Sequence, residues 1–396
     1  MAPRNASAKQ SPKPNDCHYF SSKRKRLRAA AGSKQRDVLP KGDWHERQTD
    51  ATERASFRVL GIDYGPFVAP AQRHWQTLAV SHFMFIFFLA PVLSVYVPVY
   101  MLLFTAYWWL VVLYLIWLWY DFDRAKRGSR VSERAKSWPI WRHLRDYFPI
   151  RLIKTVDLDP DRNYVFGYHP HGICAVGSFT NFATNATDFQ RLFPGIKSHL
   201  LTLVGQFWCP LRREYLMHAD VHECSRESVD YLLSKQDKGH AVVIVVGGAA
   251  EAANAYPGRH KLILRRRRGF IKIALSHGAD LVPVYSFGEN DIFNRFFNNV
   301  TPAGRKFQRS VKGLLGFMPI LFHGRGIFNQ TFGVLPFRRP IHTVVGRPIT
   351  VAKVECASGQ LIDAVHAQYT QALVHLFETH KRHYGVPQHV HLQFTD

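Results

Sequence analysis

Cysteine and acidic residues are scarce in this sequence; the first shortage excludes two classes of protein, and the second indicates the kind of partner. The five cysteines are scattered and odd in number, and none forms a C-x-x-C pair. This excludes a disulfide scaffold and a zinc ribbon and indicates a reducing compartment. The 29 acidic residues face 52 lysines and arginines, which gives a net charge of +23. Such a charge favours an anionic partner: a nucleic acid, a membrane surface or a polyanionic ligand.

The N-terminal region lacks an apolar segment after the methionine, which excludes a secretory signal. Residues 1–72 are instead rich in Lys, Arg, Ser and Pro, with few apolar residues before Phe57. This composition predicts a basic, largely disordered tail. The basic run at residues 22–28 fits an import signal, a patch for anionic lipid or nucleic acid, or a solvated arm, and we assign it no function.

Charged residues are absent from residues 74–120, which are dense in Phe, Leu, Val, Trp and Tyr. One membrane pass needs about 20 residues at about 1.5 Å each, so the run is long enough for two. Pro91 and Pro98 stand where such a segment would bend. Basic residues flank both ends, which favours two cytosolic ends. A buried helix pair in a soluble core would keep a polar face. We therefore predict a transmembrane or re-entrant hairpin over residues 73–120.

The composition of a globular domain returns in residues 121–396. Buried strands are predicted at short apolar runs, at residues 164–166, 200–204, 241–246, 281–285 and 343–345. Helices are predicted between and after them, at residues 226–235, 269–277 and 360–384. This alternation predicts an α/β fold with a central sheet and flanking helices.

Two histidines, His169 and His171, follow the first of these strands within the sequence H-P-H-G. Open α/β folds place ligands just beyond the carboxyl ends of strands. A neutral imidazole there can accept a proton from a hydroxyl group that attacks a carbonyl. The alternatives are a turn whose histidines bond the main chain, or an H-x-H metal site with His218 and His222 as the nearest further ligands.

A second motif, Gly247-Gly248-Ala249-Ala250-Glu251, follows the strand at residues 241–246. The glycines permit close backbone approach or a left-handed turn. If the strands are parallel, Glu251 lies at the same sheet edge as the histidines and can hold an imidazole in one tautomer. Alternatively, Glu251 is an acid that complements a helix N-terminus. The spacing of the motif favours neither of these two roles for Glu251.

Four consecutive arginines, at residues 265–268, precede the predicted helix at residues 269–277. They suit the phosphates of an acyl-CoA, a nucleic acid or anionic lipid heads. Aromatic residues do not alternate with them and the chain has no convincing nucleic-acid-binding motif, so we expect no nucleic-acid partner.

With these motifs the sequence resembles the type-2 diacylglycerol acyltransferase family, which includes monoacylglycerol and wax-ester acyltransferases. The similarity runs from about residue 57 to the end of the chain and is most specific in R-x-G-F-x-x-x-A-x-x-x-G-x-x-L-V-P-V-x-x-F-G-E, which fits from Arg267 to Glu289 without a break. The other matching segments are residues 73–80, Tyr147-Phe148-Pro149, the H-P-H-G motif and the G-G-A-x-E motif.

The resemblance implies a glycerol-phosphate-acyltransferase-like fold and an integral enzyme of the endoplasmic reticulum that associates with lipid droplets. Its hairpin would lie in the bilayer and its termini and catalytic domain in the cytosol. It would transfer an acyl group from acyl-CoA, a substrate, to diacylglycerol, with no cofactor and no metal. A homo-oligomer is compatible with the sequence. Monoacylglycerol and long-chain alcohols carry the same hydroxyl nucleophile and remain alternative acceptors.

The resemblance also assigns roles to residues. The catalytic residues it implies are His169, His171 and Glu251. The substrate-binding residues it implies are Tyr147, Phe148, Pro149, Gly172, Gly247, Gly248, Arg267, Arg268, Gly269, Phe270 and Glu289.

The sequence departs from glycerol-phosphate acyltransferases at one position. The related enzymes place an aspartate after the active histidine, whereas Cys174 and Val176 stand at the corresponding positions after His169 and His171. We therefore expect Glu251 to orient an imidazole, and direct transfer rather than a Cys174 nucleophile. A lipid-droplet scaffold without activity and a membrane-tethered nucleic-acid binder are weaker alternatives, because neither explains the motifs.

Overall fold

The computed structural model describes residues 57–59, 62–64, 70–295 and 322–396, all of which belong to one compact unit, Asp43–Asp396. Most of the predicted tail, with its basic run, lies outside the described residues. Within the tail, β1 (Phe57–Val59) and β2 (Ile62–Tyr64) form a short antiparallel pair.

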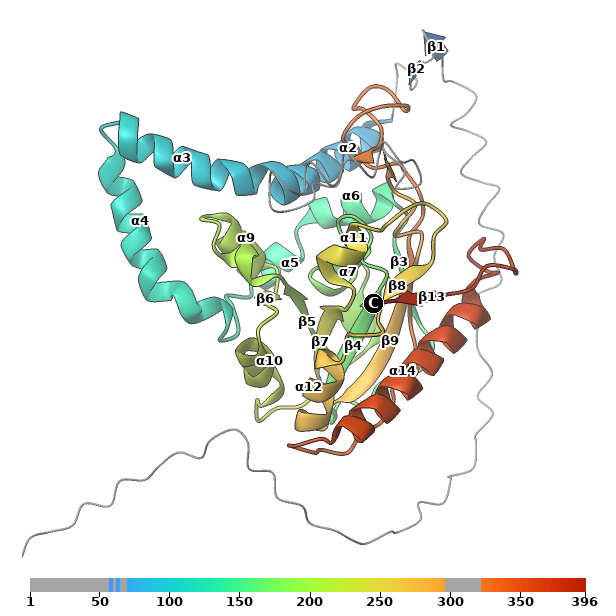
Figure 1. Ribbon diagram of the computed structural model, residues 1–396. Helices are drawn as coiled ribbons and strands as arrows, with labels where there is room; N and C mark the ends of the chain where they lie inside the picture. Colours follow the sequence, from blue (N-terminus) through green and yellow to red (C-terminus); the bar gives the residue numbers. More distant parts are fainter. Residues whose placement is uncertain (1–56, 60–61, 65–69, 296–321) are drawn as a thin grey trace, which may run out of the picture. The chain divides into compact units, whose positions relative to one another are not determined.

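A seven-stranded sheet forms the centre of the unit (Figure 1). Its strands, in spatial order, are β3 (Arg151–Lys154), β12 (His342–Val345), β9 (Asp280–Phe287), β4 (Tyr164–His169), β7 (His240–Val245), β5 (Lys197–Thr202) and β6 (Val221–Glu223). The last five run parallel to one another, whereas β12 and β3 run the opposite way. The predicted central sheet is therefore confirmed, as a mixed sheet with its parallel strands in succession.

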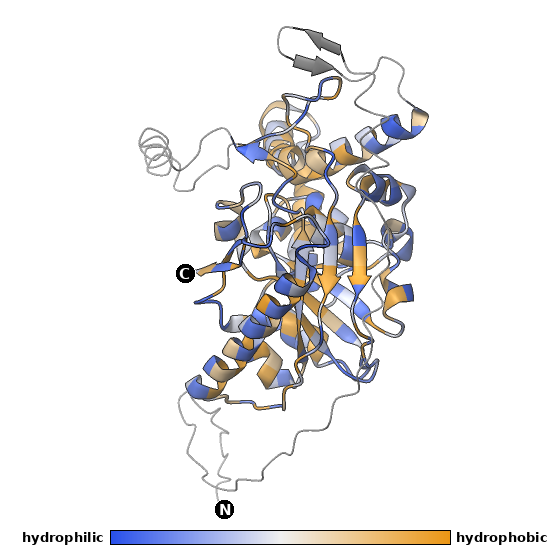
Figure 2. Cartoon of the chain, turned by 90° about the vertical axis from the view of Figure 1, so that its right-hand side faces the viewer, coloured by the Kyte–Doolittle hydropathy of each residue, from blue (hydrophilic) through white to orange (hydrophobic). Residues whose placement is uncertain are grey.

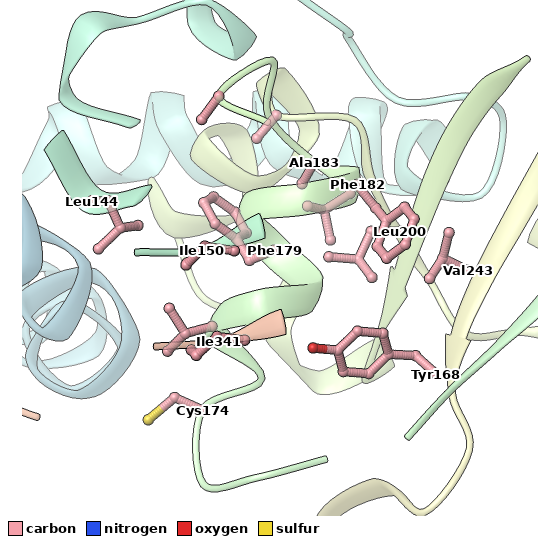
Figure 3. Packing of buried hydrophobic residues seen from close by; sticks show 14 of the residues in the cluster. Leu144, Ile150, Tyr168, Cys174, Phe179, Phe182, Ala183, Leu200, Val243 and Ile341 are labelled. Atoms are coloured by element: carbon pink, nitrogen blue, oxygen red, sulfur yellow. The ribbon is translucent and has the colours of Figure 1, made fainter. Parts of the chain in front are cut away.

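Helices cover both faces of the sheet, so its central strands β4 and β9 are buried along their whole length. Along β4, Tyr164, Phe166 and Tyr168 belong to the core on one face and Val165 to the core on the other. The first core includes side chains from α2 (Ala71–Met84), α6 (Pro139–Tyr147) and α7 (Val176–Phe182). Figure 3 shows this packing, with Phe179 and Phe182 of α7 between Leu144 and Val243.

The second core lies against α10 (Arg226–Leu233), α12 (Gly269–His277) and α14 (Gly359–His380). Helix α14 is amphipathic, and Figure 2 shows polar and apolar residues along its length. The Ser358 hydroxyl accepts a hydrogen bond from the Leu361 amide and caps the start of α14. All three predicted helices are confirmed, although α14 ends before residue 384.

The shorter elements connect this framework. They are η2 (Phe122–Ala125), α5 (Glu133–Lys136), α8 (Phe189–Leu192), η3 (Val204–Phe207), α9 (Arg212–His218), α11 (Gly248–Ala252), β8 (Lys261–Ile263), β10 (Asn294–Arg295), β11 (Phe322–His323) and β13 (Gln393–Thr395). Strand β13 pairs in parallel with β8, close to the end of the chain.

The apolar N-terminal segment is helical. Helix α2 continues through a π-helical turn, η1 (Phe85–Leu89), into α3 (Ala90–Phe104). Among the described residues, this combined helix, Ala71–Phe104, is the one that is long and apolar enough to cross a membrane, and its 34 residues extend about 51 Å. Its first part packs on the domain, where Ala79, Val80 and Phe83 are buried.

The following helix, α4 (Trp108–Asp121), leaves the end of α3 at an angle after a short turn, and most of its side chains are exposed (Figure 1). With 14 residues it extends about 21 Å, less than the roughly 30 Å of a hydrocarbon core. The structure thus supports one candidate span, and the hairpin stays a prediction. Pro98 lies inside α3, so the chain does not turn there; it turns at residues 105–107.

Candidate active site

The histidine motif, the glycine motif and Glu289 meet at one edge of the sheet. Strands β7, β4 and β9 are parallel neighbours, so their carboxyl ends lie together. His169 ends β4, the Gly247-Gly248 pair follows β7, and Glu289 follows β9. The expectation that Glu251 and the histidines share one edge is confirmed.

His169 is fully buried, and its two ring nitrogens have different surroundings. Nε2 lies 3.1 Å from the Tyr369 hydroxyl of α14, whereas Nδ1 has no hydrogen-bond partner among the described residues. Burial lowers the pKa of His169 to about 3, because a buried imidazolium loses its hydration. The imidazole is therefore neutral at pH 7, the state that a general base requires.

His171 is partly exposed, and its ring bonds its own turn. Nδ1 lies 3.0 Å from the Gly172 carbonyl oxygen, an acceptor, so Nδ1 carries the proton and Nε2 is left with its lone pair. Burial lowers the pKa of His171 as well. Each of the two predicted histidines thus presents one basic ring nitrogen.

Glu251 contacts the histidine motif differently from the expectation. Its carboxylate accepts hydrogen bonds from the main-chain amides of His171 and Ile263, each at 2.7 Å. The predicted hydrogen bond to an imidazole was wrong: the buried carboxylate fixes the backbone of the turn, because two main-chain amides satisfy its oxygens. Burial raises the pKa of Glu251 to about 7, and these two amides oppose the shift.

The glycines of the site make room for its side chains. A Cβ atom on Gly247 would lie 2.2 Å from the Glu251 carboxyl group, so the first glycine of the motif is required by close approach. Gly172 adopts a φ of +60°, and a Cβ there would lie 2.8 Å from Cγ of Glu289. Gly248 also has a positive φ, of +62°.

Glu289 lies beneath the turn and is fully buried. Its carboxylate accepts hydrogen bonds from the Tyr168 hydroxyl at 2.8 Å and from the Gly177 amide of α7 at 3.1 Å. Burial raises its pKa to about 7, against the effect of these donors. Glu289 therefore supports the loop between β4 and α7, and substrate binding by Glu289 stays a prediction.

The arginine segment lies beside the Gly247-Gly248 turn and is exposed. The Arg267 guanidinium donates to the Gly247 carbonyl oxygen at 3.1 Å, and Arg268 pairs with Asp363 of α14 at 2.6 Å. Gly269 starts α12, and the Phe270 ring is buried against Tyr369 with 4.9 Å between ring centroids. The structure thus brings Arg267 next to the histidine edge, whereas Phe270 is a core residue.

Tyr147, Phe148 and Pro149 lie at the end of α6, and both aromatic rings are buried. The Tyr147 ring has the guanidinium groups of Arg325 and Arg338 at 5.2 and 4.2 Å from its centroid. Among the described residues, no hydrogen bond, ion pair or ring contact joins these three residues to His169, His171 or Glu251. The segment instead ties α6 to the middle of α2, because both arginines donate to Thr77.

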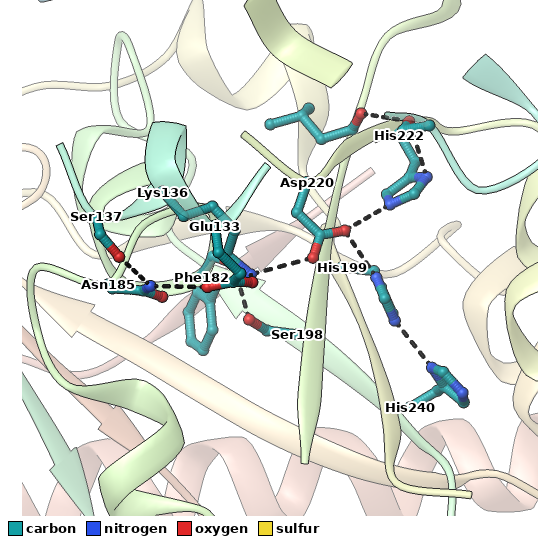
Figure 4. Close-up of polar contacts among 12 residues, drawn as sticks. Glu133, Lys136, Ser137, Phe182, Asn185, Ser198, His199, Asp220, His222 and His240 are labelled. Atoms are coloured by element: carbon teal, nitrogen blue, oxygen red, sulfur yellow. Dashed lines mark hydrogen bonds and ion pairs between the residues drawn. The ribbon is translucent and has the colours of Figure 1, made fainter. Parts of the chain in front are cut away.

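A second buried polar cluster lies at β5, β6 and β7 (Figure 4). The ligating atoms of His199, Asp220 and His222 lie within 4.8 Å of one another. However, Asp220 Oδ1 accepts hydrogen bonds from both imidazoles, at 2.9 and 2.8 Å, and the Lys136 ammonium lies 3.2 Å from Oδ2. The carboxylate is thus already neutralised by a fixed cation, which fits a hydrogen-bonded network and not a metal centre.

His218, the other histidine considered for a metal, does not join this cluster. It is exposed, and its Nδ1 donates to the Arg130 carbonyl oxygen at 2.9 Å. The helical spacing that suggested a pair with His222 does not apply, because α9 ends at His218 and His222 lies in β6.

Tyr369 and Gly167 were missed by sequence analysis. Tyr369 lies 200 residues after His169, and one tyrosine in a long amphipathic helix carries no signal of its own. Gly167 stands in the middle of β4, where a glycine is unusual and marks close approach of another group.

Comparison with known proteins agrees with this arrangement. Residues 100–395 match the family described as diacylglycerol acyltransferase. The 2-acylglycerol O-acyltransferase 1 of Bos taurus is 46% identical over 85% of this chain and 100% of its own length. The diacylglycerol O-acyltransferase 2 of Homo sapiens is 49% identical over 71% of this chain and 73% of its own length.

A solved structure, the 1-acyl-sn-glycerophosphate acyltransferase of Thermotoga maritima, aligns with 77% of this chain and 94% of its own. With 8% identity and a TM-score of 0.35, this is a loose likeness. The family match and the two close relatives, by contrast, cover most of the chain. The protein is an acyltransferase that belongs to the diacylglycerol acyltransferase family.

Proposed function

We propose that the protein transfers a fatty acyl group from acyl-CoA to the free hydroxyl of diacylglycerol and so forms triacylglycerol, with an imidazole of the H-P-H-G motif as general base. The observation that carries the proposal is the pair of neutral imidazoles, His169 and His171, at the edge where three parallel strands end. No cofactor is needed, because the thioester of acyl-CoA is itself the activated donor.

The proposed reaction is a direct transfer. The imidazole accepts the hydroxyl proton while the acceptor oxygen attacks the thioester carbonyl carbon. The carbon–sulfur bond then breaks, and the departing CoA thiolate takes the proton back from the imidazolium. One ester forms, one thioester is consumed and the base is regenerated.

The lipid acceptor is proposed to arrive from the membrane side, along the apolar N-terminal helix. Phe83 of α2 contacts Phe179 of α7 with 5.6 Å between ring centroids, and α7 follows the histidine turn directly. The apolar core thus extends from the candidate span to the strand that carries His169. We place the protein in the endoplasmic reticulum membrane and at lipid droplets, with cytosolic termini and α3 and α4 as a hairpin.

The CoA phosphates are proposed to bind the exposed arginine segment. Two of its arginines have carboxylate partners, since Arg266 pairs with Asp396 and Arg268 with Asp363. Arg265 and Arg267 have no ion pair with any described residue, and both are exposed. Their guanidinium groups suit bidentate bonding to phosphate oxygens.

An acceptor assay tests the proposed activity. Membranes from cells that express the protein receive labelled acyl-CoA with diacylglycerol, 2-monoacylglycerol or a fatty alcohol, and the products are separated by thin-layer chromatography. We expect labelled triacylglycerol to be the main product with diacylglycerol. The control membranes carry the His169→Ala/His171→Ala variant. A protein that forms no ester with any acceptor would be a scaffold, and the proposal would be wrong.

Monoacylglycerol is the second candidate acceptor, because the Bos taurus relative is a 2-acylglycerol O-acyltransferase, and the whole length of that relative matches this chain. The two acceptors differ in one acyl chain, and pocket shape separates such lipids by only modest energies per methylene. Labelled diacylglycerol as the main product would favour this alternative.

Cys174 provides a prediction that separates direct transfer from an acyl-enzyme route. The thiol is buried in the core, and burial raises its pKa well above the usual value, so it is not a thiolate at pH 7. We expect Cys174→Ala to keep at least about half of the activity, since positioned base catalysis does not use the thiol. Loss of activity in a variant with an unchanged melting temperature would favour the acyl-enzyme.

A further inference from the structure

The two histidines of the motif are not equivalent, and the difference lies in Tyr369. This hydroxyl is 3.1 Å from Nε2 of His169 and 3.1 Å from the Gly167 carbonyl oxygen. Tyr369 is fully buried, and its α14 helix packs on β9, the neighbour of β4. The residue that orients the imidazole of His169 therefore comes from the far end of the chain.

Counting hydrogen bonds fixes the tautomer of His169. If Nε2 carries the proton, it donates to the Tyr369 oxygen, and the tyrosine proton is free to donate to the Gly167 carbonyl; both contacts are then satisfied. If Nδ1 carries the proton, the single tyrosine proton must choose between Nε2 and the carbonyl, and Nδ1–H becomes a buried donor without a partner among the described residues. The Nε2–H tautomer is therefore favoured.

The position of the hydroxyl is itself fixed from two sides. A Cβ atom on Gly167 would lie 2.0 Å from the Tyr369 oxygen, so the hydroxyl occupies the space that a side chain at this position would fill. On its other side the Tyr369 ring packs edge-on against Phe270. These contacts explain a glycine inside a buried strand, and they give Phe270 of the R-x-G-F motif a role in support of the site.

We infer that Tyr369 is the positioning residue of the active site, which holds His169 as the Nε2–H tautomer so that Nδ1 is the atom that takes the proton from the acceptor hydroxyl. This inference rests on the proposed function. Nδ1 accepts the proton as the ester bond forms, and it returns the proton to the CoA thiolate as the carbon–sulfur bond breaks. In Ser-His-Asp triads an aspartate holds the imidazole in the correct tautomer and orientation. Tyr369 performs this role here through a neutral hydroxyl group.

The test is a double-mutant cycle with Tyr369→Phe and His169→Ala in the full-length protein. We expect Tyr369→Phe to lower kcat about 10-fold, the effect of one neutral hydrogen bond, with the KM for acyl-CoA unchanged within about twofold. In the His169→Ala background the same change should have no further effect, because Tyr369 acts only through His169.

Tyr164→Phe is the matched control. Tyr164 is equally buried, its hydroxyl donates to the Asp159 carbonyl oxygen, and it starts β4 at the end opposite His169. We expect this variant to keep wild-type kcat. Wild-type kcat in Tyr369→Phe would overturn the inference. So would a decrease of kcat by Tyr369→Phe that is as large in the His169→Ala background as in the wild-type protein. Wild-type activity in His169→Ala alone would instead show that the proposed base is wrong.

Discussion

Replacing His169 with alanine is expected to lower the rate of triacylglycerol formation by about 10²–10⁴-fold, the usual contribution of a positioned general base. The variant keeps the Glu251 and Glu289 contacts that hold the turn, because these involve main-chain atoms and other side chains. The measurement is kcat for labelled acyl-CoA and diacylglycerol in membranes with equal amounts of each protein.

The His171→Ala variant is the matched control. Its side chain bonds only the adjacent Gly172 carbonyl oxygen among the described residues, so its loss should cost less than that of His169. The double variant should still fractionate with membranes. Full activity in the double variant would contradict the general-base proposal, and a larger loss for His171→Ala would transfer the role of base to His171.

The pH dependence provides a check on the same histidines. A general base works only when it is unprotonated, so the rate falls as pH drops through its pKa. An exposed histidine with a pKa of about 6.5 would lose about three quarters of its neutral form at pH 6. Because burial lowers the pKa of His169 to about 3, we expect protonation of His169 to cause no loss of kcat from pH 8 to pH 6. A decrease of kcat near pH 7 would instead report on Glu251 and Glu289, whose pKa values burial raises to about 7.

Replacing Asp220 with alanine is expected to lower the free energy of unfolding by about 3–5 kcal/mol, because it leaves a buried lysine and two imidazoles without their shared acceptor. Lys136, His199 and His222 all bond this carboxylate, and all three are buried. Burial alone would raise the pKa of Asp220, but its interactions with His199 and His222 lower it well below the usual value. The carboxylate is thus ionised in the folded protein.

Denaturant unfolding of the purified protein in detergent measures this effect. The control is Asp157→Ala, whose ion pair with Lys154 is exposed and should contribute less than about 1 kcal/mol. The stabilising effect of Asp220 is present above the pKa of an unfolded aspartate and is lost as pH falls through its lower folded pKa. An Asp220→Ala protein as stable as the Asp157→Ala control would contradict this account.

Local patterns predicted much of the framework. The apolar runs that became β4, β7 and β9 are bounded by glycine or polar residues, and α12 matches its predicted limits because Gly278 ends it in a left-handed conformation. The shared edge of the histidine and glycine motifs followed from one assumption, that the strands are parallel. Composition, however, gives only the length of the apolar segment. It does not show that the chain turns at residues 105–107 and leaves α4 too short to count as a second span.

The contacts of the site depended on residues far apart in the sequence. Glu251 was placed at the correct edge, but no pattern showed that it bonds the main chain and not an imidazole. The partner of His169 lies in a helix near the end of the chain, where a tyrosine is also a normal core residue. Such choices are made by tertiary packing, which a single sequence does not record.

The pairing of β13 with β8 has a practical consequence. The Thr395 carbonyl oxygen accepts hydrogen bonds from the amides of Leu264 and Arg265, and Asp396 pairs with Arg266, so the last residues hold the base of the arginine segment. A purification tag or fluorescent fusion attached directly after Asp396 would crowd this strand. Expression plasmids for this protein should therefore separate any such fusion from Asp396 by a flexible linker.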